Sequence, residues 1–275
     1  MITRPHQKDR HPASAASLLG ALALLCLFTA GAARAQSADG LQQTLSKTRD
    51  LVGHFAEDYS YLRYQEDVVQ QKLKNNDKVD YKQEMVYDSM IRMRFDDGRL
   101  RVDEQRLMDK RPRNAQARPL LNTYGFSILA MVFHPYYESS FRFEQSGTDV
   151  LDGKSLVRVR FFHLPSTPTP VLYQMIGPDR PLEISGTAWI DPVTGEIHRI
   201  DADFESTVGD MGVKTIRAEL VYAPVALRDE TELQFLPVSA TIDLETPRQH
   251  WRNVHHYTDY RKYRVAMNMP GAATQ

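Results

Sequence analysis

Three histidines near the end of the chain, His250, His255 and His256, form its densest group of ionisable side chains. Imidazoles bind metals when several of them converge on one point. The surrounding sequence alternates as a strand does, so the adjacent pair points to opposite faces and at most one member can join His250. We therefore interpret the three histidines as surface or edge residues. A metal site is the less favoured alternative, and we expect no metal and no cofactor.

Two carboxylates, Asp201 and Asp203, lie two residues apart and would share one face of a strand. Such a pair can hold calcium or act as general acid and base. No glycine-containing loop with further oxygen ligands follows at the spacing of a calcium loop. Because apolar residues alternate with both aspartates, we interpret them as the solvated face of a strand. A hydrolase that uses them with one histidine is a weak alternative.

Aromatic and basic side chains interleave after residue 256, a pattern that can stack nucleic-acid bases. They are Tyr257, Tyr260, Tyr263, Arg261, Lys262 and Arg264. The whole chain has 34 Lys and Arg against 35 Asp and Glu, a net charge of −1, which gives no electrostatic reason for a nucleic-acid partner. We predict a strand whose tyrosine rings pack on a sheet with the cations outside, and no nucleic-acid binding.

Signatures of the common enzyme classes are absent from the sequence: it has no P-loop, no G-x-S-x-G, no H-E-x-x-H and no dinucleotide-binding fingerprint. Its residues are 42% hydrophobic and 25% charged, as in ordinary soluble globular proteins. We expect a folded protein that is not an enzyme, although a site assembled from distant residues would leave no such signature.

The first 35 residues have the three parts of a secretory signal peptide. A positive start is followed by an apolar run from Leu18 to Phe28 and by small residues at Ala33-Arg34-Ala35. The apolar run is short for a membrane span of ~20 residues, so an uncleaved anchor is the less favoured alternative. We expect an exported protein, periplasmic or secreted, whose mature chain starts at Gln36. The single Cys26 precedes that point, so the mature chain would contain no disulfide.

After this leader, apolar residues spaced by three and four predict a helix over Gln36–Asp58. The apolar period then becomes two, as in the half-buried strand from Met85 to Phe95, and Asp97-Gly98 predicts a hairpin turn. Further strands follow at regular spacing to the end of the chain. Together these patterns predict about ten antiparallel strands.

One strongly apolar stretch, from Leu120 to Phe133, interrupts the run of strands. Asn122 or Thr123 can cap its start, and Pro135 must stop it. We predict a second, short and largely buried helix here.

The apolar faces of the strands form the largest candidate binding surface. If the sheet curls, these faces become concave, and adaptable methionines suit flexible acyl chains. The alternative is that a helix covers the surface completely and makes it ordinary core. The expected ligand-binding residues are Met85, Tyr87, Met93, Phe141, Phe143, Val159, Phe161 and Trp189. We predict no catalytic residue.

Short segments across residues 60–265 resemble an uncharacterised family of exported bacterial proteins and, more broadly, the outer-membrane lipoprotein carrier (LolA/LolB-like) superfamily. The segments are Leu121-Asn122-Thr123, Phe133-His134-Pro135, Phe141-Arg142-Phe143, Gly186 to Glu196, Val221-Tyr222-Ala223-Pro224, Leu236-Pro237-Val238 and Tyr257 to Tyr263. The resemblance implies an open antiparallel sheet with helices at its mouth, a cavity for lipoprotein acyl chains, and no covalent catalysis. No residue of a carrier's working machinery can be placed here by position.

We therefore predict a β-rich α+β fold with a single strongly curved antiparallel sheet, an open half-barrel of about ten strands. One N-terminal helix and one mid-chain helix would cover its concave face. The predicted organisation is a signal peptide over residues 1–35, the half-barrel domain over 36–267 and a disordered tail over 268–275.

Two functions of different classes fit these features. The first is an exported carrier, expected to be a monomer, that holds a lipid, an acyl chain or a lipoprotein anchor in an apolar cavity. The second is an interaction module of the cell envelope with a closed core, whose outer face or sheet edge binds another protein.

Overall fold

The computed structural model describes residues 39–56, 61–110, 123, 125–173, 180–204, 212–228 and 230–262. The predicted signal peptide and the predicted tail lie outside these residues. The chain divides into two units, Met1–Gln42 and Gln43–Gln275, and the sheet, the pocket and the ionic cluster described below all belong to the second. Among the described residues, no helix has the length and apolar character needed to cross a membrane.

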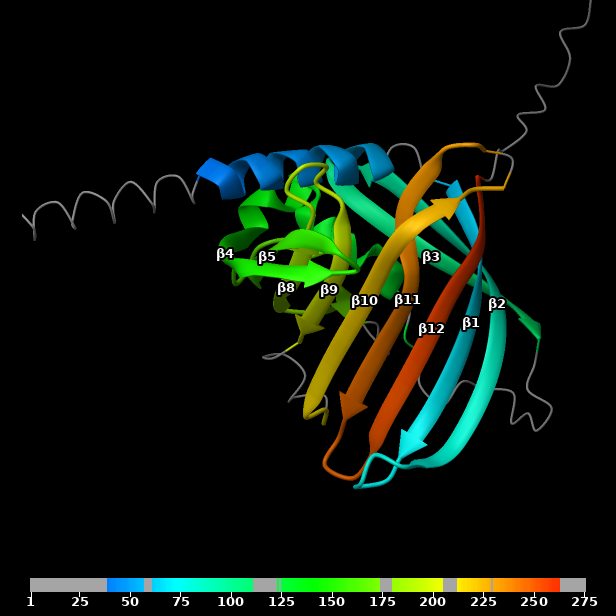
Figure 1. Ribbon diagram of the computed structural model, residues 1–275. Coiled ribbons are helices and arrows are strands. Elements are labelled where there is room, and N and C mark those ends of the chain that lie inside the picture. The colour runs from blue at the N-terminus through cyan, green and yellow to red at the C-terminus, as the bar shows by residue number, and fades with distance from the viewer. Residues whose placement is uncertain are drawn as a thin grey trace, which may run out of the picture. The chain divides into compact units, whose positions relative to one another are not determined.

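Ten strands form one antiparallel sheet that does not close on itself, with β3 at one edge and β4 at the other (Figure 1). In spatial order they are β3 (Arg99–Lys110), β2 (Val79–Asp96), β1 (Tyr61–Leu73), β12 (His250–Lys262), β11 (Leu233–Glu245), β10 (Thr215–Ala226), β9 (Ile197–Asp203), β8 (Ser185–Ile190), β5 (Lys154–His163) and β4 (Phe141–Leu151). Two short strands, β6 (Leu172–Tyr173) and β7 (Arg180–Pro181), pair separately. Figure 1 shows β5 and β8 running across the direction of β10 to β12, so the sheet is strongly curved. The prediction of an open antiparallel sheet of about ten strands is confirmed.

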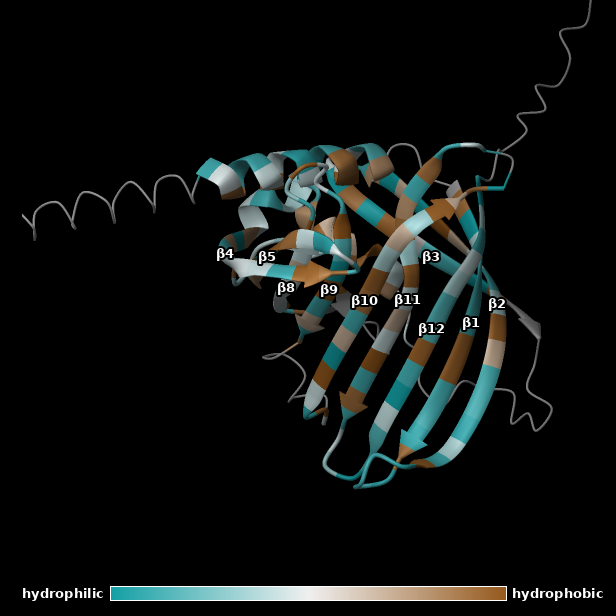
Figure 2. Cartoon of the chain, viewed as in Figure 1, coloured by the Kyte–Doolittle hydropathy of each residue, from teal (hydrophilic) through white to brown (hydrophobic). Residues whose placement is uncertain are grey.

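Strand alternation follows the predicted pattern in β2, whose buried side chains include Met85, Tyr87, Ile91 and Met93. Phe95 breaks the pattern, because its side chain is 61% exposed at the end of the strand. The turn that follows has positive φ at both Asp97 and Gly98, 48° and 71°, as a two-residue hairpin turn requires. Figure 2 shows the resulting alternation of apolar and polar residues along the strands.

The N-terminal helix covers residues 39–56, which confirms the helix predicted over Gln36–Asp58. The mid-chain helix is a 3-10 helix, η1 (Phe126–Phe133), and a second one, η2 (Pro135–Ser140), follows it. The burial of η1 and its end before Pro135 are as predicted, but its start is not. Gly125 begins it at φ 83°, without a side-chain cap, and Thr123 uses its hydroxyl elsewhere. Asn122, the other predicted cap, lies outside the described residues.

One face of the sheet, hereafter the inner face, carries η1, which contacts β9, β10 and β11. Phe133 of η1 packs on Phe143 and Phe161, with ring centroids 5.2 and 5.9 Å apart. The same face holds the completely buried Leu220 and Ala240 of neighbouring strands. The core of the second unit therefore lies between the inner face and η1.

Candidate functional site

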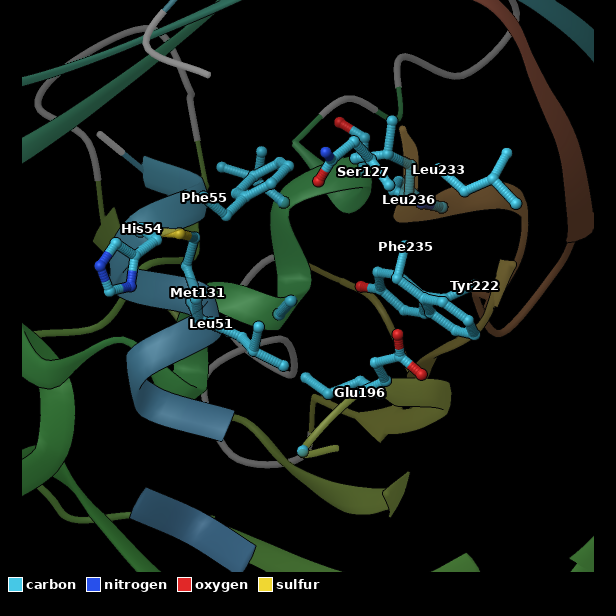
Figure 3. A pocket seen from close by; sticks show the side chains of 17 residues that line it. Leu51, His54, Phe55, Ser127, Met131, Glu196, Tyr222, Leu233, Phe235 and Leu236 are labelled. Carbon is cyan, nitrogen blue, oxygen red and sulfur yellow. The ribbon is translucent and has the colours of Figure 1, made fainter. Parts of the chain in front are cut away.

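A cavity of about 280 Å³ opens between the N-terminal helix, η1, the start of β9 and the strands β10 and β11 (Figure 3). This volume is close to the lower end of the range found for small-molecule sites, ~300–1,000 Å³. The cavity is lined mostly by apolar groups from five separate stretches of chain. They are Leu51, Val52, His54, Phe55, Ser127, Ile128, Ala130, Met131, Gly195, Glu196, Ile197, Tyr222 and residues 233–237.

The helix that forms one wall of the cavity is attached to the hairpin between β8 and β9. The Lys47 ammonium donates to the carbonyl oxygens of Pro192 and Val193 at 3.0 and 2.9 Å. The buried Thr48 hydroxyl lies 3.0 Å from the carbonyl oxygen of Gly195. The β8–β9 hairpin thus positions the pocket wall.

A second attachment joins the same helix to η2 and β4. The Arg49 guanidinium pairs with Glu138 at 3.0 Å and lies 5.8 Å from the ring centre of Phe143. One turn later, Gly53 lies against the ring of Pro135. Leu51 and His54, which line the cavity, are exposed on this helix, so they border the mouth of the pocket. The contacts of Lys47, Thr48 and Arg49 hold the helix in this place.

A buried ionic cluster lies on the same inner face, toward the β3 edge of the sheet, where β1, β2, β3 and β12 are neighbours. The Glu66 carboxylate is completely buried and accepts hydrogen bonds from Arg106 at 2.6 Å and from Ser89 at 2.9 Å. The His255 side chain, 1% exposed, also contacts Glu66, with its Nδ1 at 2.7 Å. A carboxylate buried this deeply requires such partners, because desolvation disfavours its charge.

A directional chain of hydrogen bonds continues from this carboxylate. The Asn253 amide donates to the Thr123 hydroxyl at 2.7 Å, and that hydroxyl lies 2.9 Å from Nε2 of His255. With His255 neutral, Thr123 donates to Nε2 while Nδ1 donates to Glu66, so every group in the chain has a consistent role. Thr123 is therefore a link between the sheet and the segment that leads into η1, which is why it does not cap the helix.

A second buried carboxylate, Glu104, extends the cluster to η1. It accepts from Nε of Arg106 at 3.1 Å, from the Tyr64 hydroxyl at 3.3 Å and from the backbone amide of Gly125. The Tyr64 hydroxyl also lies 3.1 Å from the hydroxyl of Ser127, a pocket residue. The ionic cluster thus supports the 3-10 helix that forms the pocket wall.

The two carboxylates of the cluster have pKa values shifted in opposite directions. Burial alone would raise the pKa of Glu66, but the hydrogen bond from His255 and the charge of Arg106 lower it below its ordinary 4.5. Burial raises the pKa of Glu104 above 4.5, and the nearby charge of Glu66 adds to this effect. Relative to an ordinary glutamate, the cluster therefore favours the ionised form of Glu66 and disfavours the ionised form of Glu104.

We expect these opposite shifts to appear in the pH dependence of two variants. A carboxylate whose pKa is lowered by folding stabilises the folded state above its unfolded pKa, and this stabilisation is lost as the pH falls. A carboxylate whose pKa is raised by folding stabilises the folded state at low pH, and this stabilisation is lost as the pH rises. The cost of Glu66→Gln should therefore shrink below about pH 4.5, and the cost of Glu104→Gln should shrink above it. Urea unfolding from about pH 3.5 to about pH 8 measures both; parallel profiles would refute the assignment.

The sequence carried one signal of this cluster that pattern reading missed. Glu66 shares its strand parity with the buried Leu62, Tyr64 and Val68, and a charged residue on a buried parity indicates a buried ion pair. Its partners lie 40 and 189 residues away in the sequence, so the pattern could not identify them.

None of the eight residues predicted to bind a ligand lines the cavity. Met85, Tyr87 and Met93 are buried in β2, where Met85 and Tyr87 pack with Val68. The Tyr87 ring also lies under the guanidinium of Arg106, 5.4 Å away. Tyr87 thus contacts the ionic cluster, and contact of the three side chains with a ligand stays a prediction.

The other predicted residues lie near β4, β5 and β8. Phe141 and Phe161 are buried and pack edge to face, with centroids 6.2 Å apart, while Phe143 stacks on η1. Val159 is completely buried and pairs with Ala188. Trp189 follows Ala188 in β8 and must therefore point to the other face of the sheet. There its indole donates to Asp149 at 2.8 Å. The single shared face expected for all eight residues is therefore corrected for Trp189.

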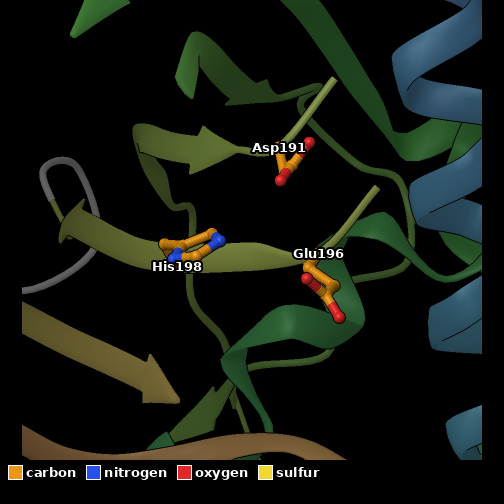
Figure 4. A group of neighbouring side chains, drawn as sticks. All are labelled: Asp191, Glu196 and His198. Atoms are coloured by element: carbon orange, nitrogen blue, oxygen red, sulfur yellow. The ribbon is translucent and has the colours of Figure 1, made fainter. Parts of the chain in front are cut away.

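Three possible metal ligands lie together at the β8–β9 hairpin (Figure 4): Asp191, Glu196 and His198 offer ligand atoms within 4.8 Å of one another. Both carboxylates also serve the turn. Asp191 accepts from the amide of Val193 at 2.8 Å, and Glu196 accepts from the hydroxyl of Thr194 at 3.1 Å. Burial and the charge of Lys154 lower the pKa of His198. These hydrogen bonds account for the two carboxylates as parts of the hairpin.

The candidate acid–base residues are ion-paired. Asp201 accepts two hydrogen bonds from Arg199, at 2.7 and 2.8 Å, and Asp203 pairs with Arg217 at 3.2 Å. Ala202 between them is buried, as is Ile200 before them, which confirms that both aspartates lie on the outer face of β9.

The predicted opposite orientation of the adjacent histidines is also confirmed, because His255 is buried in the ionic cluster while His256 is exposed. His250 instead pairs with Asp243, its Nε2 3.1 Å from the carboxylate. The three imidazoles therefore do not converge. The prediction that all three are surface or edge residues is wrong for His255, which is buried because it pairs with Glu66.

The interleaved aromatic and basic residues of β12 are arranged as predicted where they are described. Tyr257 and Tyr260 are 3% and 1% exposed and pack on Tyr64, with centroids 5.6 and 5.3 Å apart. Asp259, at φ 54°, adds the irregularity that returns Tyr260 to the inner face. Arg261 pairs with Asp88 and Asp259 at 3.3 and 2.6 Å, and Lys262 with Glu230 at 3.0 Å. Tyr263 and Arg264 lie outside the described residues.

No protein-family model and no curated protein matches this chain, whereas solved structures do. A DUF1329 family protein from Desulfovibrio piger matches at 9% identity and a TM-score of 0.43, over 82% of this chain and 92% of that chain. An outer-membrane lipoprotein-sorting protein domain from Vibrio parahaemolyticus matches at 8% identity and 0.41, over 77% and 90%. The chain is also similar to a LolA superfamily protein from Nitrosomonas europaea, at 11% identity and a TM-score of 0.37, over 79% of this chain and 94% of that chain.

Proposed function

We propose that this chain is an exported carrier or binding protein of the cell envelope, periplasmic or secreted, that holds an acyl chain of a lipid or lipoprotein. The observation that supports this most is the apolar cavity of about 280 Å³ between the N-terminal helix, η1 and the inner face. Apolar walls bind acyl chains through the hydrophobic effect, which needs no directional chemistry. No cofactor and no catalytic step enter this proposal.

The arrangement of the wall supports a carrier rather than a closed core. Leu51 lines the cavity and is still 44% exposed, and Leu233 across the mouth is 64% exposed. Apolar side chains that are both exposed and part of a cavity lining mark a surface that a hydrophobic ligand can cover. An acyl chain entering between them would remove this apolar surface from water.

Protein purified from cells without detergent should carry acyl species that native mass spectrometry detects and denaturation releases.

In Leu51→Glu we expect at least a tenfold lower affinity for lauric acid, because a carboxylate at the mouth disfavours apolar contact and repels the ligand's own charge. The fold should persist, since Leu51 is already half exposed. Leu107→Glu, at an equally apolar position that is 69% exposed on β3 and outside the lining, is the matched control. Equal binding by the two variants, or wild-type protein free of lipid and unable to bind lauric acid, would contradict the carrier function.

A second function, protein binding at a sheet edge, has one specific observation in its favour. β3 is a 12-residue edge strand, and its Leu107 side chain is exposed. Edge strands can accept a strand from a partner, whose side chains then use such apolar positions. The same two variants separate the functions: loss of an envelope partner in Leu107→Glu, with normal lauric acid binding, would favour this second function.

A further inference from the structure

One buried polar group in the cavity has no acceptor for its hydrogen. Tyr222 of β10 lines the cavity and is 6% exposed, and its hydroxyl donates to no acceptor among the described residues. Figure 3 shows its side chain entering the pocket from the strand side, across from Leu51 and Met131 of the helical walls. A buried hydroxyl without a partner costs stability, so such a group calls for an explanation.

Three other polar side chains of the lining are already engaged. Ser127 bonds to the Tyr64 hydroxyl at 3.1 Å, and Glu196 accepts from Thr194 at 3.1 Å. The His54 ring lies 2.7 Å from the carbonyl oxygen of Asp50. Tyr222 therefore differs from these three groups, because its hydroxyl hydrogen has no acceptor among the described residues.

The chemistry of this phenol makes it a donor. Burial raises the pKa of Tyr222 well above its ordinary value of 10.0, so the hydroxyl keeps its proton at any physiological pH. The backbone amide of Ala130 is the one nearby group that lowers this pKa. An amide can approach only the lone pairs of the oxygen, so it leaves the O–H hydrogen without an acceptor.

We propose that Tyr222 donates a hydrogen bond to the carbonyl oxygen of an acyl ester or amide, so that the pocket prefers acylated ligands to hydrocarbons of similar size. This inference rests on the proposed carrier function and narrows its ligand. The carbonyl is the natural acceptor, because it is the polar group attached directly to an acyl chain. A site that hydrogen-bonds one ligand group discriminates against ligands that lack it, since the buried donor is then left unpaired.

The test compares two probes on wild-type protein and on Tyr222→Phe. Diphenylhexatriene, a hydrocarbon fluorophore, reports occupation of the pocket, and methyl laurate, which carries an ester carbonyl, competes with it. In Tyr222→Phe we expect methyl laurate to bind about 5- to 10-fold more weakly, the value of one hydrogen bond. Diphenylhexatriene should bind within about twofold of wild type.

Tyr137→Phe is the matched control, since Tyr137 is also buried, 3% exposed, but lies outside the lining. It should leave the ratio of the two affinities unchanged. If both probes bind and Tyr222→Phe keeps the wild-type ratio, the role of Tyr222 is overturned while the carrier function stands. If neither probe binds wild-type protein, the carrier function itself has failed.

Discussion

Replacing Arg106 by methionine should lower the free energy of unfolding by about 3–5 kcal/mol, the usual cost of breaking a buried ion pair from one side. Arg106 is the cation for two carboxylates, Glu66 and Glu104, whose side chains are 0% and 3% exposed. The buried carboxylates cannot regain water when the guanidinium is removed. Urea denaturation at neutral pH measures the loss as a lower midpoint.

Arg199→Met is the control for this prediction, because Arg199 also bridges two carboxylates, Asp201 and Glu219. Its own side chain is 33% exposed and its partners are 39% and 47% exposed. Exposed pairs contribute little, so the loss should be at most about 1 kcal/mol. Equal losses in the two variants would show that burial does not set the strength of the cluster.

A second variant identifies the cause of the loss. Adding Glu104→Gln to Arg106→Met removes one of the two unpaired charges, so we expect it to restore part of the lost stability. Glu104 accepts a hydrogen bond from the backbone of Gly125 at the start of η1. Because Arg106→Met disturbs Glu104, this variant should also weaken ligand binding in the pocket. A double variant less stable than Arg106→Met would contradict this account of the cluster.

Replacing Gly195 by alanine should detach the N-terminal helix from the β8–β9 hairpin. Gly195 has φ 85°, and a Cβ atom there would come within 2.7–2.8 Å of Lys47 and of the backbone of Thr48. The left-handed conformation costs about 1–2 kcal/mol for a residue with a side chain. The forced displacement of the helix adds about 1–3 kcal/mol, as overpacking does in cores. Thermal unfolding and limited proteolysis within residues 43–56 would measure the two consequences.

Gly153→Ala separates the two costs. Gly153 has a similar φ of 78°, but a Cβ atom there meets nothing within 4 Å. This variant should therefore lose only the conformational part and keep its pocket intact. If Gly195→Ala and Gly153→Ala are equally destabilised and equally resistant to protease, the hairpin does not hold the helix.

The sequence by itself determined the local elements of this protein. Alternation along β2 predicted which of its side chains are buried, because neighbouring strand residues must point to opposite faces. Asp97-Gly98 predicted a hairpin turn, because its two positive φ angles are tolerated best by glycine and aspartate or asparagine. The 3.6-residue period predicted the N-terminal helix, since it produces one apolar stripe. These properties depend on residues close together in the chain.

The tertiary structure alone decided which elements meet. The pocket joins residues of the helix around Leu51, of η1 around Met131, of the hairpin at Gly195 and of the strands at Tyr222 and 233–237, and no local period relates them. Pairing also decided the orientation of Trp189: its type predicted an apolar inner position, but its place next to Ala188 put it outside. The Glu66–His255 contact exists because β1 pairs with β12, since the order of strands in a sheet depends on how the whole chain buries its apolar faces.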